Sequence, residues 1–121
     1  LRSPANLGAH AADVGRWVER LNDALTLLGR PFAFRVDKAI RSYVANYPNW
    51  INDWHKRAMA DQIEQRIFPK LRGIETDQAQ RELREIGSVI DELDDEPLKK
   101  AFRESWENQS TFLFRGVVRD E

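Results

Sequence analysis

The chain has 121 residues, about the length of one domain, and its 19 lysines and arginines nearly balance its 20 aspartates and glutamates. The resulting net charge of -1 argues against a dedicated nucleic-acid-binding module, which is typically strongly basic. No cysteine is present, which excludes disulfides, thiolate metal sites and cysteine nucleophiles and is consistent with a cytoplasmic protein. No apolar run is long enough to span a membrane. Because the first residue is Leu1 rather than methionine, we expect a piece of a longer protein.

The first half of the chain predicts two helices joined by a short link. Apolar residues at three- and four-residue steps indicate a helix over residues 9–28, which Gly29 ends. A link rich in proline and phenylalanine follows at residues 30–35. A second helix is expected over residues 36–47, where Pro48 stops it.

A third helix is expected over residues 49–71. Its apolar stripe includes Trp50 and Trp54, which we expect to point toward the core. Pro69 lies near the end of this helix and is expected to kink or terminate it, because proline removes a helical donor.

The rest of the chain predicts two more helices and an extended tail. Thr76 is a candidate N-cap for a fourth helix over residues 77–93, and a fifth is expected over residues 97–107. Aromatic and β-branched residues at 111–118 indicate an extended segment or lone strand that needs a partner. The expected architecture is therefore a single all-α domain over residues 1–121, with about five helices and this short C-terminal segment.

No complete active site is visible in the sequence. It contains no phosphate-binding glycine loop and no GxSxG motif, and His10 and His55 have no nearby ligands at metal spacing. The acidic residues within 91–96 suggest either a metal site or carboxylates stabilised by the dipole of a helix starting at Pro97, and we favour the dipole. We predict no catalytic residue and no metal ligand.

The sequence contains four tryptophans, which are candidates for either the core or a binding face. Aromatic residues at helical spacing mostly pack inside a fold, although an exposed aromatic face can stack on bases or dock a partner. We favour the core for the set, and less so for Trp50, which lies beside the Pro48 turn.

Arg35 lies just after the proline-aromatic link, at the start of the second predicted helix. If Phe32 and Phe34 fix its position, its planar guanidinium can reach out of the domain toward a phosphate. The alternative is an ordinary exposed or salt-bridged arginine, which spacing alone favours.

Two blocks of the chain resemble the C-terminal lid of McrB-like AAA+ NTPases. The first block reads PFAFRVDKAIRSYV at residues 31–44, and the more specific second block reads ADQIEQRIFPKLRG at residues 60–73. The late helix and the aromatic segment from Phe112 to Phe114 also suit that family. The resemblance covers roughly residues 10–118.

The resemblance implies a lid subdomain that follows an ATP- or GTP-hydrolysing core with its phosphate loop and Mg²⁺. Such a lid closes over the nucleotide and relays the hydrolysis state around a ring of subunits, without being catalytic alone. By position, Arg35 matches the arginine that contacts the terminal phosphate. Arg30 is a second candidate for nucleotide binding, although it can instead cap the first helix, and Lys70 and Arg72 are expected to form a polar C-terminal turn.

The implied partners are the chain's own AAA+ core and neighbouring subunits, with a nuclease subunit and DNA contacted through other regions. A rival hypothesis is a stand-alone helical interaction module with a tryptophan-rich face. A third, a DNA-binding helical domain, is disfavoured by the near-neutral charge and would require salt-dependent affinity.

Overall fold

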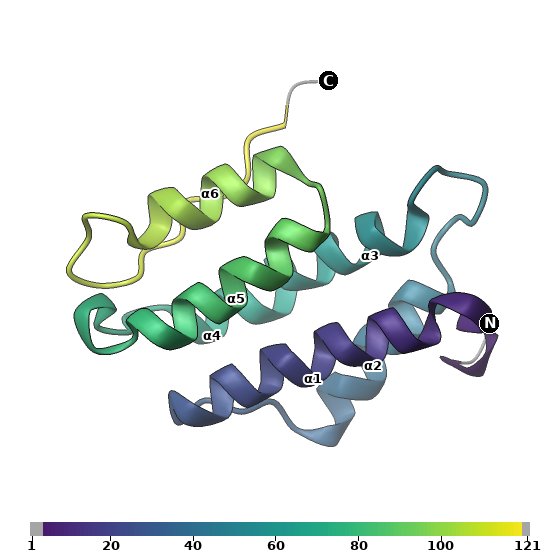
Figure 1. Ribbon diagram of the computed structural model, residues 1–121, viewed down its shortest axis with the longest axis horizontal. Coiled ribbons are helices and arrows are strands. Elements are labelled where there is room, and N and C mark those ends of the chain that lie inside the picture. The colour runs from purple at the N-terminus through teal and green to yellow at the C-terminus, as the bar shows by residue number, and fades with distance from the viewer. Residues whose placement is uncertain (1–3, 120–121) are drawn as a thin grey trace.

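A computed structural model describes residues 4–119 and shows an all-α fold, as the sequence predicts. Figure 1 shows α5 lying between α1 and α6, while α2 packs against α3. In chain order the elements are η1 (Pro4–His10), α1 (Ala11–Leu27), α2 (Phe34–Ala45), α3 (Trp54–Gln62), η2 (Ile63–Ile67), α4 (Phe68–Leu71), η3 (Thr76–Gln78), α5 (Gln80–Glu92) and α6 (Glu96–Trp106). Because α3, η2 and α4 follow one another without a break, these described residues form five main helices.

The third helix begins later than the sequence predicts, at Trp54 rather than near residue 49. Residues 46–53 form a loop that contains Pro48, and Asp53 takes a left-handed conformation with φ 54° just before the helix. Proline restricts the residue before it to extended conformations, which opens the chain at this point. The prediction that Trp50 points into the core is wrong, since 82% of its surface is exposed in this loop.

Pro69 does not terminate the third helix, which continues to Leu71. The turn before it, η2, is a π-helix over Ile63–Ile67. Proline has no N–H to donate to the preceding turn, and its ring crowds the carbonyl four residues earlier. The wider π-helical turn provides room for the ring, so the helix accommodates the proline instead of ending there.

The core is closed by the C-terminal segment. Phe112 is 1% exposed, and its N–H and carbonyl bond to Ile74 (2.8 Å) and Gly73 (3.0 Å). A single antiparallel bridge joins Glu75 to Thr111. The tail is thus extended, as the sequence predicts, and its partner is the turn that follows α4.

The prediction that Thr76 is the N-cap of the fourth helix is wrong. Its hydroxyl donates to the carbonyl of Gln109, and α5 begins at Gln80 without a side-chain cap. The threonine ties the turn before α5 to the loop after α6.

Candidate functional site

The link between α1 and α2 is anchored to α1 by two hydrogen bonds. The Arg30 N–H donates to the Leu25 carbonyl (2.8 Å), and the Phe32 N–H donates to Asn22 Oδ1 (3.0 Å). The Phe32 ring is 5% exposed. Ala33 then precedes α2 in an extended conformation and has no side-chain acceptor to cap it. The position of the first turn of α2 therefore depends on the link.

Arg35 is the second residue of α2 and is exposed. Within residues 4–119 its guanidinium makes no hydrogen bond or ion pair, whereas Asp37 in the same turn accepts from Arg41 Nε (2.6 Å). The Arg35 donors are therefore available to a partner outside the described chain. The prediction that Phe34 helps fix Arg35 is wrong, because 82% of the Phe34 surface is exposed.

Arg30 bonds to the end of the third helix rather than capping the first. Its Nη1 donates to the carbonyls of Arg72 (2.7 Å) and Lys70 (3.0 Å). These carbonyls lie where the helix ends and leaves its acceptors without helical partners. Lys70 Nζ donates in return to the Pro31 carbonyl (3.4 Å), and Lys70 lies in the last turn of α4, as expected for a polar C-terminal turn.

The two blocks that carry the family resemblance thus meet in the fold. Besides the bond from Lys70 Nζ to the Pro31 carbonyl, the Tyr43 hydroxyl of α2 donates to Asp61 Oδ2 of α3 (2.9 Å). Burial and this bond raise the pKa of Tyr43 to about 12. The first block is therefore joined to the second near both ends of α2.

His10 and His55, far apart in sequence, lie with their rings stacked at 3.8 Å. The Trp17 ring also stacks with His55, at 5.8 Å between ring centres, and Trp54 meets both histidines edge-on. Burial, followed by the nearby His10, lowers the pKa of His55, whose Nδ1 is buried without a hydrogen-bond partner among the described residues. His55 thus lies at the edge of the core, stacked among aromatic rings.

The four tryptophans do not form one exposed face. Trp17 is buried, while Trp54 and Trp106 are half-buried and pack against the core. The prediction of core tryptophans is confirmed for these three. Trp50 projects from the loop between α2 and α3, beside Ile51, which is 37% exposed.

The acidic stretch before α6 has structural roles. Asp95 Oδ1 accepts from the Leu98 N–H (3.0 Å) as the N-cap of α6, and Asp94 pairs with Lys56 Nζ (2.9 Å). The dipole interpretation of the stretch is thereby confirmed for Asp95. No group of three metal-ligating side chains comes together in the part of the chain that the structure describes.

Glu92 of α5 joins this helix to α1 through side-chain hydrogen bonds that the sequence does not predict. It accepts hydrogen bonds from Arg20, from the Trp17 indole (3.1 Å) and from Arg16 (3.3 Å). Hydrogen bonds from Arg20 and then Trp17 lower the pKa of Glu92. The signal that could have located it is a pair of facing stripes, one basic on α1 and one acidic on α5.

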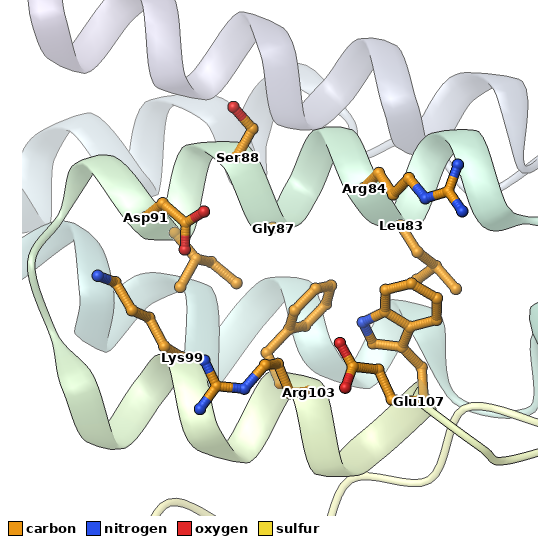
Figure 2. Close-up of a pocket in the computed structure, with 11 residues that line it drawn as sticks. Leu83, Arg84, Gly87, Ser88, Asp91, Lys99, Arg103 and Glu107 are labelled. Carbon is orange, nitrogen blue, oxygen red and sulfur yellow. The ribbon is translucent and has the colours of Figure 1, made fainter.

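A cavity of about 260 Å³ lies between α5 and α6 (Figure 2). Phe102 and Trp106 line it together with charged residues of both signs, and Gly87 brings the two helices close, since a Cβ there would lie 3.2 Å from the Phe102 ring. Figure 2 shows Asp91 and Lys99 at one end and Glu107 at the other. The charges around this cavity do not converge on one sign, unlike the uncompensated cation at Arg35.

The fold and this geometry define an all-α domain in which Arg35, at the start of α2, has no hydrogen-bond or ion-pair partner among the described residues. Residues 4–110 match the family model described as "Domain of unknown function (DUF8727)", and the chain belongs to that family. No curated protein and no solved structure matches the chain. Among the described residues, no helix is both long enough and apolar enough to cross a membrane.

Proposed function

We propose that this chain is the C-terminal lid subdomain of a McrB-like AAA+ NTPase, acting in the cytoplasm, and that Arg35 contacts the terminal phosphate of ATP or GTP. The observation that carries the proposal is the exposed, unpaired guanidinium in the first turn of α2, within the first of the two resembling blocks. The five-helix architecture is compatible with a lid, and a cysteine-free composition is compatible with the cytoplasm.

The residues present suit a phosphate. A guanidinium offers a planar fork of donors that matches phosphate oxygens, and the start of a helix favours negative charge. Bound nucleotide with Mg²⁺ would supply the phosphoryl group that is transferred. Arg35 would bind its terminal phosphate and stabilise the charge that shifts there during transfer.

This chain contributes a nucleotide contact and no hydrolytic machinery of its own, because its sequence has no phosphate-binding glycine loop. The proposed partners are the AAA+ core that supplies that loop and the neighbouring subunits of a ring, with a nuclease and DNA engaged through other regions. Hydrolysis by the 121-residue chain alone would contradict this division of roles.

The test is steady-state hydrolysis of ATP and GTP by the protein that joins this chain to its core. Arg35→Ala is expected to lower kcat by about 10²–10³-fold, since a charge-stabilising donor is removed. Arg35→Lys should recover part of the rate, because lysine keeps the positive charge although it lacks the planar fork of donors. The matched control is Arg81→Ala, which changes an exposed arginine at the second position of α5 and should leave kcat unchanged.

Equal rates for Arg35→Ala and the wild type would refute the proposal. That result would favour the alternative of a stand-alone interaction module. Its binding surface would be centred on the exposed Trp50 rather than on a face of four tryptophans. In that case Trp50→Ala should abolish partner binding while Arg35→Ala leaves it intact.

A further inference from the structure

The start of α2 has no cap of its own. Its N-cap residue, Ala33, offers no side-chain acceptor, and the first helical hydrogen bonds run from Val36 (2.9 Å) and Asp37 (3.1 Å) to the Ala33 carbonyl. A helix end without a side-chain cap frays easily. The direction in which Arg35 projects therefore depends on how the preceding link is held.

That link is held from two sides. On the α1 side, Asn22 Oδ1 accepts from the Phe32 N–H (3.0 Å). On the other side, Arg30 Nη1 bonds to two carbonyls at the end of the third helix, at 2.7 and 3.0 Å, and Lys70 Nζ bonds to the Pro31 carbonyl (3.4 Å). The half-buried Arg30 thus connects Lys70 and Arg72, which lie 40 and 42 positions further along the chain, to the turn that carries Arg35.

We infer that Arg30 is a positioning residue for Arg35: it locks the α1–α2 link to the end of the third helix and thereby fixes the arginine that meets the nucleotide. This inference rests on the proposed function. It also gives a mechanical path from the second resembling block to the nucleotide, because a shift of Lys70 and Arg72 would move the link and Arg35 with it.

The inference differs from a direct role of Arg30 in phosphate binding. A positioning residue acts only through Arg35, so its effect disappears once Arg35 is absent. A residue that binds phosphate itself, or that only stabilises the fold, keeps its effect in either background.

The experiment is a double-mutant cycle on nucleotide hydrolysis by the protein that includes the AAA+ core. Arg30→Ala is expected to lower kcat by about 10–10²-fold, as a misplaced catalytic group does. In the Arg35→Ala background the same change should alter kcat by less than about twofold, because Arg30 then has no Arg35 side chain to position. Arg30→Lys should recover part of the rate, since an ammonium can still bond a carbonyl.

A second variant and a structural measurement accompany the cycle. Asn22→Ala removes the other anchor and should behave like Arg30→Ala. Hydrogen exchange on the same protein should be faster for the amides of Val36 and Asp37 in both variants, and unchanged for Lys99, whose amide bonds to Asp95 in α6.

The outcomes separate the inference from the proposed function. If Arg35→Ala leaves hydrolysis intact, the proposed function is wrong and the inference falls with it. If Arg35→Ala lowers kcat but Arg30→Ala lowers it further by the same factor in both backgrounds, the positioning role is overturned and the proposed function stands. Unchanged exchange at Val36 and Asp37 in the Arg30→Ala variant would also overturn it.

Discussion

The imidazole of His55 stacks with the rings of His10 and Trp17 where η1, α1 and α3 meet. Its pKa is lowered, first by burial, then by the charge of His10, with Lys56 acting the same way and Asp13 and Asp53 acting against it. The folded state therefore favours the neutral ring. Protonation would place a charge among aromatic rings, and no described residue accepts a hydrogen bond from the buried Nδ1.

This shift predicts the pH dependence of folding stability. The unfolded chain binds the proton near pH 6.5 and the folded chain only at lower pH. The contribution of His55 to the free energy of unfolding is thus complete above 6.5 and is lost progressively as the pH falls toward the lower folded pKa. Urea unfolding between pH 7 and pH 5.5 should show falling stability for the wild type and a flatter profile for His55→Phe. Parallel profiles would contradict this assignment.

At the scale of single residues, the sequence predicts where a functional side chain lies along its helix. It does not predict which distant residues that side chain contacts. The proline-aromatic link indicates that Arg35 begins a helix, and this position is confirmed. The contacts of Arg30 with Lys70 and Arg72, and of His10 with His55, join residues about 40 positions apart. No periodicity within one helix specifies which other helix end it will face.

Among the elements, α6 has the clearest side-chain cap. The Asp95 side chain is 4% exposed, accepts from the Leu98 N–H and pairs through both oxygens with Arg119 Nη1 at 3.0 Å. One carboxylate thus fixes both the start of α6 and the passing C-terminal segment.

Substitution at Asp95 should separate these two contributions. Asp95→Ala is expected to cost about 2–4 kcal/mol, the sum of a lost N-cap and a lost charged hydrogen bond. Asp95→Asn keeps a capping oxygen but loses the negative charge, and should cost about 1–2 kcal/mol less than the alanine variant. Chemical denaturation of both variants measures the difference, and equal losses would mean that the cap contributes nothing.

Helix boundaries follow from the sequence where proline or glycine marks them clearly. Gly29 and Pro48 separate the first three helices, and Pro97 lies in the first turn of α6 as predicted. The late start of α3 is missed because apolar residues at 50 and 51 continue a helical pattern into what is a loop. Periodicity cannot distinguish a buried tryptophan from one that projects from a turn.

At the scale of the whole molecule, four phenylalanines from distant parts of the chain form one cluster. Phe68 of α4 lies 5.7 Å from Phe102 of α6 and 4.7 and 6.0 Å from Phe114 and Phe112 of the tail, measured between ring centres. The sequence predicts that the tail needs a partner. It does not identify the turn at 73–76, because that pairing is set by how the helices stack.

Phe112→Ala should therefore destabilise the domain strongly, by about 3–5 kcal/mol, the usual cost of removing a buried aromatic ring. Val118→Ala is the control, since Val118 lies in the same segment with 84% of its surface exposed, and should change stability by no more than about 0.5 kcal/mol. Thermal or urea unfolding of both variants measures the effect. Similar stability for the two would show that the tail does not complete the core.

The place of Phe112 also affects how the protein folds as it is made. The ribosome produces the helices first, so α4, α5 and α6 emerge while the Phe68 and Phe102 rings still lack their tail partners. A nascent chain paused anywhere before this segment presents that apolar surface to chaperones or to other nascent chains. Final closure of the fold therefore has to wait until the tail leaves the exit tunnel, even though most of the helical structure precedes it.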